Sequence, residues 1–190
     1  SQLESSQKAL QDQQSSTASE LAQTSKAVDA AVATQSAYNA QLAGLQASKL
    51  ALETEKKAYT DAGIEAQYEQ INESFASVRN IASGYGMDAS AYPADISDAL
   101  KSPKKLEALT AFMKQIGQSD AAASLTTDNL KQLDQIVNTR LPQIDTELAN
   151  LAVEIQAAQV IADQVNEKRD LRQAMIFLQQ YGITMNLAVK

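Results

Sequence analysis

Apolar residues recur in a single heptad phase from Leu3 to Tyr59. One position of the repeat holds Leu3, Leu10, Thr17, Thr24, Ala31, Tyr38, Leu45, Leu52 and Tyr59, and the other holds Gln7, Gln14, Leu21, Val28, Gln35, Leu42, Lys49 and Lys56. Steps of three and four residues alternate, which keeps one stripe of a helix turned toward a partner. The pattern predicts a long helical arm over residues 1–61.

This first seam is diluted with Gln, Thr and Lys, so each layer buries little apolar surface. That composition argues against a tight two-stranded zipper. Alanines beside the seam, among them Ala30, Ala33 and Ala40, allow neighbouring helices to approach closely. A helical hairpin or bundle is therefore favoured over an isolated rod.

A middle region over residues 62–125 begins where Gly63 interrupts the first helix. Its first segment is a helix whose apolar positions are Ile64, Tyr68, Ile71, Phe75, Val78 and Ala82. We expect this helix to stop at the turn formed by Gly84, Tyr85 and Gly86, because glycine tolerates left-handed backbone.

Two short helices are expected in the rest of the middle region. Pro93 and Pro103 stand where helices can start, and Ser102 is the predicted N-cap of the second. The apolar face of the second consists of Leu106, Leu109, Met113 and Ile116, and Gly117 ends it. The stretch SDAAAS then reads as a link to the cap residues Thr126, Thr127 and Asp128.

A return arm is predicted over residues 126–181. Its seam consists of Leu130, Val137, Ile144, Leu151, Ala158 and Val165 together with Asp134, Leu141, Leu148, Ile155, Ala162 and Arg169. Pro142 lies inside this pattern and removes one backbone hydrogen bond, so we expect a kink or a short break there. The helix is expected to end at Gly182.

The tail, residues 182–190, alternates between apolar and other side chains. Its apolar positions are Ile183, Met185, Leu187 and Val189. Alternation predicts a strand, and a lone strand leaves an unpaired edge. The tail would lead into a further domain, add to a sheet of a partner or sister subunit, or lie on the bundle. We expect its four apolar residues to contact a partner.

The predicted fold is therefore all-α. It is an elongated antiparallel coiled-coil hairpin or helical bundle with a small helical tip region and a short strand-like tail at the C-terminus. Seam periodicity is the same in an intramolecular hairpin and in a coiled coil between chains, so the pattern leaves both open.

Composition narrows the function classes. The chain has 16 Lys and Arg against 23 Asp and Glu, a net charge of −7, which disfavours binding to nucleic acid. It has no His, Cys or Trp, so the usual general base, thiol nucleophile and soft metal ligands are missing. We therefore predict a protein that is not an enzyme and holds no cofactor or metal.

Two clusters invite a chemical interpretation and are better explained by structure. Glu65, Glu69 and Glu73 lie one turn apart but off the apolar seam, which is typical of a solvated face. Ser102 precedes Lys104 and Lys105 in a Ser-Lys arrangement, but helix capping accounts for the serine.

The tip region carries the other candidate contact residues. Lys101, Lys104 and Lys105 form the densest basic group and could meet an acidic partner. Tyr85 and Tyr92 are either exposed contact residues or part of a small core. We predict partner contact at all five.

Three features of the sequence bear on where the protein is located. The chain has no stretch of 18 or more apolar residues, so no helix spanning a membrane is expected in this segment. Richness in Ala, Gln, Ser and Thr without Cys is typical of a bacterial extracytoplasmic protein. The chain starts without Met, which fits either removal of a signal peptide or excision from a longer protein.

Two helical arms joined by a small helical tip are similar to hairpin segments of bacterial envelope and secretion proteins. The predicted function is a non-enzymatic helical interaction or assembly module, a structural subunit or stalk that contacts a protein partner or a second copy of itself. The alternatives are a ligand-sensing helical bundle of a membrane receptor and a component of a helical pore-forming toxin.

Overall fold

The computed structural model describes residues 1–188, and for residues 182–188 it describes the backbone alone. The elements are α1 (Gln2–Asp61), α2 (Ile64–Gly84), the 3₁₀ helix η1 (Ala89–Ala91), α3 (Ile96–Lys101), α4 (Pro103–Gln115), α5 (Ser119–Ser124), α6 (Thr127–Gln135), the π-helix η2 (Ile136–Arg140) and α7 (Leu141–Ala188). Residues 1–188 contain no strand, and the all-α class is confirmed.

The chain forms two compact units. Unit 1 comprises residues 1–48 and 151–190, and unit 2 comprises residues 49–150. Both α1 and α7 contribute to each unit. Within each unit, the helix that precedes the middle region packs antiparallel to the helix that follows it, which confirms the predicted hairpin architecture.

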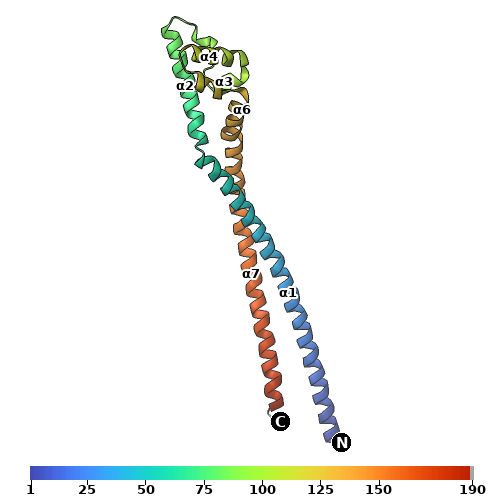
Figure 1. Cartoon of the computed structure of the whole chain (residues 1–190). Helices are drawn as coiled ribbons and strands as arrows, with labels where there is room; N and C mark the ends of the chain where they lie inside the picture. The colour runs from blue at the N-terminus through green and yellow to red at the C-terminus, as the bar shows by residue number, and fades with distance from the viewer. Residues whose placement is uncertain (189–190) are drawn as a thin grey trace. The chain divides into compact units, whose positions relative to one another are not determined.

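Unit 1 is a pair of helical segments from α1 and α7 that run in opposite directions (Figure 1). The buried side chains among residues 1–48 and 151–181 are small, and they are Val28, Ala31, Ala158 and Ala162. Small side chains let two helix backbones approach closely, but the seam residue Ala31 does this in α1, and the flanking Ala30, Ala33 and Ala40 are exposed.

Polar contacts join the two helices of unit 1. The side-chain amide of Gln35 donates to Asn166 Oδ1, and Gln35 Oε1 accepts a hydrogen bond from the guanidinium of Arg169 at 2.8 Å. Three residues further along α7, Arg172 donates to the carbonyl oxygen of Ala27 of α1 at 3.3 Å. As the α1 residue number falls, the α7 number rises, which fixes the antiparallel register.

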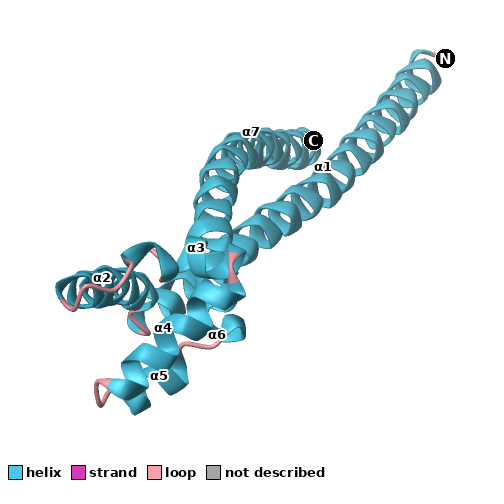
Figure 2. Ribbon diagram, turned by 90° about the horizontal axis from the view of Figure 1, so that it is seen from above, coloured by secondary structure: helices cyan, strands magenta, loops and turns pink. Residues whose placement is uncertain are grey.

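Unit 2 holds the larger apolar core. Phe75 of α2, Ile96 of α3, Leu109 of α4 and Leu130 of α6 are fully buried, and Figure 2 shows these helices gathered together. An aromatic pair and shorter apolar side chains complete the core: Tyr92, Phe112, Val78, Ala82, Ala99, Leu106, Met113, Ala122 and Leu125.

Helix α2 has the predicted bounds and the predicted glycine stop. Gly86 has a φ of 74°. Its amide donates to Ser83 O at 3.0 Å, and the amide of Met87 donates to Ala82 O at 2.9 Å. This is a Schellman motif, in which the residue after the C-cap is left-handed and is therefore most favourably glycine. Gly117 ends α4 in the same way, with a φ of 83°.

Two local predictions for the middle region are wrong, and the one for Ser102 is confirmed in position but not in its hydrogen bond. Helix α3 begins at Ile96 with Asp95 as its N-cap, three residues after Pro93. Ser102 is the N-cap residue of α4, but its side chain makes no capping hydrogen bond. SDAAAS is helix α5 rather than a link, because its three alanines favour a helix and Ala122 is buried in the core.

Pro142 does not stop the return helix. The hydrogen bonds widen to the π pattern over Ile136–Arg140, and α7 then continues from Leu141. A proline ring crowds the carbonyl four residues earlier, and a π turn is one way for a helix to absorb such a mismatch. In place of the predicted break, the hydrogen-bond pattern changes from π to α just before Pro142.

The strand prediction for the tail is wrong for residues 182–188, and so is the predicted helix end at Gly182, because α7 continues to Ala188. The spacing of Ile183 and Leu187 fits a helical turn as well as it fits alternation. A helix that already exists extends one hydrogen bond at a time, so the cost of Gly182, about 1 kcal/mol, is tolerated. Val189 lies outside the described residues.

We predict opposite effects of the same substitution at Gly84 and Gly86. Gly84 is the last residue of α2, and a Cβ there meets nothing within 4 Å. Gly84→Ala should therefore raise the free energy of unfolding by about 0.5 to 1 kcal/mol. Gly86→Ala should lower it by about 1 kcal/mol, because alanine is strained at positive φ. Urea unfolding followed by circular dichroism measures both, and equal effects would contradict the Schellman geometry.

Candidate functional site

Tyr85 is the more exposed of the two predicted tip tyrosines, with 76% of its surface accessible. It follows the last residue of α2. Two further exposed apolar residues, Ile81 and Met87, lie near it in sequence. Ile81 precedes Tyr85 by one helical turn, so the two side chains lie on the same side of the helix. This places a small apolar contact surface at the end of α2.

Tyr92 is part of a small core, which is the second of the two roles that the sequence leaves open for it. It is buried, and its ring packs on Phe112 with ring centroids 5.6 Å apart. An aromatic pair at this distance contributes to the stability of a core. Tyr92 therefore belongs to the interior of unit 2 and is not part of the surface that a partner meets.

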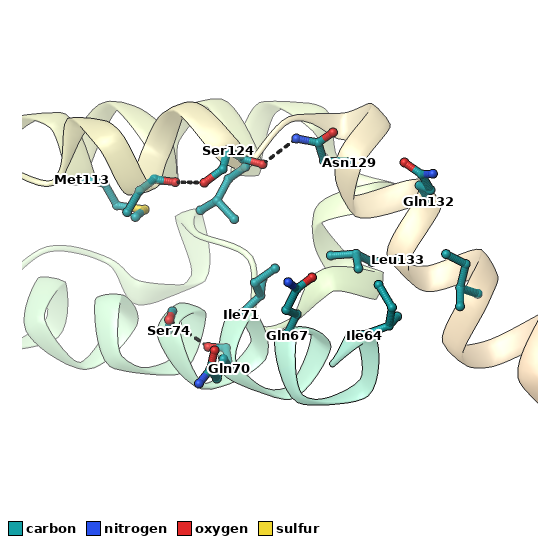
Figure 3. Close-up of a pocket in the computed structure, with 13 residues that line it drawn as sticks. Ile64, Gln67, Gln70, Ile71, Ser74, Met113, Ser124, Asn129, Gln132 and Leu133 are labelled. Atoms are coloured by element: carbon teal, nitrogen blue, oxygen red, sulfur yellow. Dashed lines mark hydrogen bonds between the residues drawn. The ribbon is translucent and has the colours of Figure 1, made fainter. Parts of the chain in front are cut away.

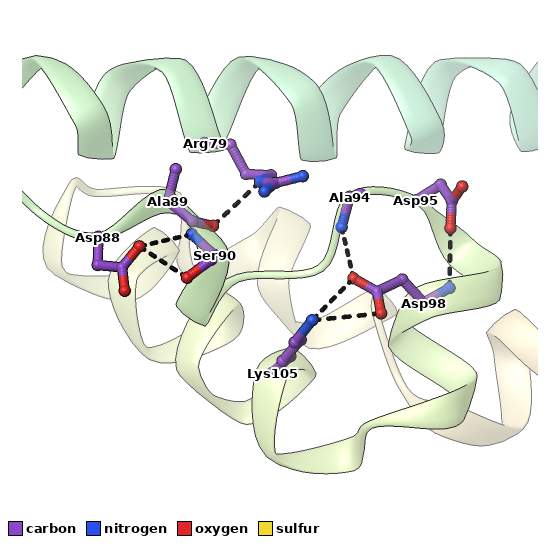
Figure 4. A network of polar contacts seen from close by, with 8 residues as sticks. All are labelled: Arg79, Asp88, Ala89, Ser90, Ala94, Asp95, Asp98 and Lys105. Atoms are coloured by element: carbon purple, nitrogen blue, oxygen red, sulfur yellow. Dashed lines mark hydrogen bonds and ion pairs between the residues drawn. The ribbon is translucent and has the colours of Figure 1, made fainter.

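The three predicted lysines differ in their surroundings. Lys105 donates to both carboxylate oxygens of Asp98, at 3.3 and 3.4 Å (Figure 4). Lys101 and Lys104 are exposed, and neither makes an ion pair with any of the residues described. The basic group is thus two solvated cations beside one engaged cation.

Asp98 organises the turn before α3. Its carboxylate accepts a hydrogen bond from the amide of Ala94 at 3.0 Å in addition to the contacts with Lys105. The Ala94 amide, followed by Lys105, lowers the pKa of Asp98 from its usual value. Arg79 of α2 donates to the carbonyl oxygen of Ala89 at 3.0 Å and ties the neighbouring loop to α2 (Figure 4). These contacts hold backbone in place.

No hydrogen bond joins the side chains of Ser102 and Lys105. The Ser102 side chain makes no hydrogen bond to the helix that it precedes. The Lys105 side chain is hydrogen-bonded to Asp98 instead.

A bidentate ion pair in unit 2 joins Arg140, at the end of η2, to Glu55 of α1. The guanidinium donates to the two carboxylate oxygens at 2.7 and 2.6 Å. This contact lowers the pKa of Glu55. Both side chains are about one-third exposed, and each has a partner of opposite charge, so the pair is a structural contact that aligns two helices.

A groove of about 560 Å³ lies between α2 on one side and α4, α5, α6 and η2 on the other (Figure 3). Ile71, Met113 and Leu125 form apolar parts of its lining. The rest of its lining is formed by Ile64, Gln67, Gln70, Ser74, Ala121, Ser124, Asn129, Gln132, Leu133 and Ile136. Its volume falls within the range of small-molecule sites.

The groove carries amide and hydroxyl groups and no charged residue. Figure 3 shows Gln67 and Ile71 of α2 pointing across it. Ser74 and Ser124 donate to carbonyl oxygens of their own helices, so their hydroxyl protons are engaged. Such a lining suits an uncharged occupant and offers neither a nucleophile with a base nor a site for an ion.

Helix α7 exposes a second apolar stripe in unit 1, which the sequence analysis missed. We name it the outer stripe and define it by Val153, Ala157, Val160, Gln164, Glu167, Leu171, Ala174 and Leu178, all of which are exposed. Val153 is 69% exposed and Leu171 is 61% exposed. These two residues are 18 positions, or about five turns, apart, so they lie in line along the helix.

The outer stripe lies on the side of α7 that turns away from α1. Ala158 is buried against α1 and follows Val153 by five residues, which is a rotation of about 140° around the helix. A heptad count started at Val153 instead of Leu151 would have revealed the stripe.

The described residues give no support for a metal site or a membrane-spanning helix. No group of three or more acidic residues that could hold an ion occurs among them, and Glu65, Glu69 and Glu73 are exposed. Among these residues, no helix is both long enough and apolar enough to cross a bilayer.

The predicted contact role of the tail remains a prediction. The backbone of Ile183, Met185 and Leu187 belongs to α7, and Val189 lies beyond the described residues.

No family model, no curated protein and no solved structure matches this chain. The surfaces described above are therefore the basis for a functional proposal.

We predict that Asp98→Asn lowers the free energy of unfolding by roughly 1 kcal/mol at neutral pH. The folded-state pKa of Asp98 is lowered, so the stabilisation is present above the usual aspartate pKa and is lost as the pH falls through the folded value. The difference between the two proteins should therefore shrink in acid. Urea unfolding across the acid range measures it, with Glu107→Gln on the exposed face of α4 as control. A difference that stays constant into strong acid would contradict the assignment.

Proposed function

We propose that this chain is a non-enzymatic helical interaction and assembly module, a structural subunit or stalk that contacts another polypeptide. The observation that carries the proposal is the outer stripe of α7. A helix with apolar side chains on two opposite faces is typical of one covered on both. The inner face of α7 is covered by α1, and the outer stripe is exposed.

The exposed apolar side chains support contact with protein. Soluble proteins seldom expose long contiguous apolar surfaces unless those surfaces bind something. Leu171 and Leu178 are each more than 60% exposed, and Met175 and Tyr181 lie close to them along the same helix. Tyr85, at the end of α2, is a second candidate contact, since tyrosine is enriched at binding surfaces.

The composition supports a location outside the bacterial cytoplasm, which we include in the proposal. The chain has no cysteine and is rich in small and uncharged polar residues. The net charge of −7 favours protein partners over nucleic acid.

A photo-crosslinking amino acid placed at Leu171 tests the interaction function. In an extract of the producing cells, position 171 should crosslink to polypeptide, because a partner covers the outer stripe. The same group at Ser36, an exposed residue of α1 in the same unit, is the matched control and should give little product. Equal yields at the two positions, or no polypeptide product at Leu171, would sink the proposal.

The groove of unit 2 favours a second candidate function, a ligand-sensing helical bundle. Its size suits a small molecule, and it lies between helices, where bundle proteins bind ligands. Because no charged side chain lines it, the ligand class would be uncharged and partly apolar.

Nile red, an uncharged apolar fluorophore, tests this second candidate. Saturable binding should weaken about tenfold in Gln67→Lys, because Gln67 points across the groove (Figure 3) and the substitution places a charge against the bound dye. Ser77→Lys adds the same charge on the exposed surface of α2 and should leave binding unchanged. Identical binding by both variants would mean that the dye does not occupy the groove.

A further inference from the structure

The outer stripe reads nearly the same in both directions along α7. From Val153 the residue classes are large, small, large, polar, polar, large, small, large, which correspond to Val153, Ala157, Val160, Gln164, Glu167, Leu171, Ala174 and Leu178. The spacings alternate between four and three, as they do in any heptad seam, so the symmetry that matters is that of the residue classes. The centre of symmetry lies between Gln164 and Glu167.

A two-fold axis perpendicular to a helix produces this kind of order. In an isologous contact, if residue i of one copy meets residue j of the other, then residue j also meets residue i. An antiparallel helix pair centred between Gln164 and Glu167 obeys this rule. A contact with an unrelated partner requires no such symmetry.

We propose that the outer stripe binds the outer stripe of a second copy of this chain, antiparallel, about an axis between Gln164 and Glu167. This inference rests on the proposed interaction function and identifies the partner. It concerns unit 1 alone, and it leaves the contact between α1 and α7 within each copy unchanged.

Each layer of the proposed pair joins residues of matching size. Leu178 meets Val153 of the second copy, Leu171 meets its Val160, and Ala174 meets its Ala157. The alanine layers allow close approach of the two backbones, and the layers around them bury large apolar side chains.

The central layers join the two polar residues of the stripe. Gln164 of each copy meets Glu167 of the other, and the amide group donates a hydrogen bond to the carboxylate. In a parallel pair, Glu167 would instead face its own symmetry mate, and two like charges would meet in the seam. The polar residues therefore favour the antiparallel arrangement.

The charged residues beside the stripe predict a characteristic salt dependence. On one flank Asp163 approaches Asp170 of the second copy, and on the other the stem of Lys168 covers Ile161. Asp170 is already paired with Arg169 at 2.6 Å. The remaining repulsion between carboxylates is screened by salt, so added salt should strengthen the dimer.

The size of the contact predicts a weak dimer. The stripe spans 25 residue steps, about 38 Å, and a strip about 10 Å wide gives roughly 400 Å² per copy. Stable interfaces bury about 800 Å² per partner. We therefore expect a dissociation constant on the order of 10 to 100 µM.

Cysteine crosslinking tests the register, and the chain contains no native cysteine. Val160→Cys and Leu171→Cys chains, one of them carrying a mass tag, are mixed and oxidised. The antiparallel register places position 160 against position 171, so the mixed disulfide should exceed either homodisulfide by about tenfold. Predominant disulfides between two copies of Leu171→Cys would indicate a parallel pair and would overturn the proposal.

Sedimentation measures the association itself, from low micromolar to several hundred micromolar chain. The unsubstituted protein should dimerise, and more tightly at about 0.5 M than at about 0.05 M sodium chloride. Val160→Gln should weaken the dimer at least about tenfold, since the two-fold axis places the substitution in two layers. Val32→Gln alters an exposed valine of α1 in the same unit and should leave the dimer unchanged.

Failure of this inference is distinguishable from failure of the proposed function. A chain that stays monomeric at every concentration and salt, while position 171 crosslinks to a different polypeptide, overturns self-association and leaves the interaction function standing. A chain that stays monomeric and gives no polypeptide crosslink overturns both.

Discussion

Polar side chains fix the register of the antiparallel helices, and the rest of the structure depends on that register. The buried residues of unit 1 are small, and a shift by one heptad would cost such a seam little packing. Gln35 contacts both Asn166 and Arg169, so the same shift would break these hydrogen bonds. In unit 2, the bidentate contact between Arg140 and Glu55 has the same role, because its geometry is strict.

The register in turn decides which faces stay exposed. Once Ala158 and Ala162 face α1, the helical rotation places Val153 and Leu171 on the opposite side of α7. That side carries several exposed apolar side chains, among them Val153, Val160 and Leu171. Exposed apolar side chains are unevenly divided between α1 and α7. Unit 1 therefore has one apolar face suited to a partner, although both helices share a similar inner seam.

Features that depend on local rules were predictable from the sequence, and features that depend on tertiary contacts were not. The heptad arms, the core position of Phe75 and the glycine stop at Gly86 follow from periodicity and backbone freedom. Two roles for Tyr92 remained open because burial depends on the helices that surround it. The sequence predicts that Lys105 contacts a partner. In the folded chain it pairs with Asp98, seven residues earlier, and only the folded turn brings the two side chains together. The apolar residues of the tail fit both the strand period and the helix period, and the tail is too short for its pattern to distinguish the two.

The two units bury very different amounts of apolar surface, and this difference links stability to association. Unit 2 has an aromatic and aliphatic core around Phe75, whereas the buried side chains of unit 1, up to residue 181, are valine and alanine. Burial of apolar area is the main source of folding free energy, so unit 1 has less of it per residue. A partner that binds the folded form of unit 1 stabilises it in proportion to the logarithm of partner concentration over the dissociation constant. Covering the outer stripe would therefore order these helices as well as join them to a partner.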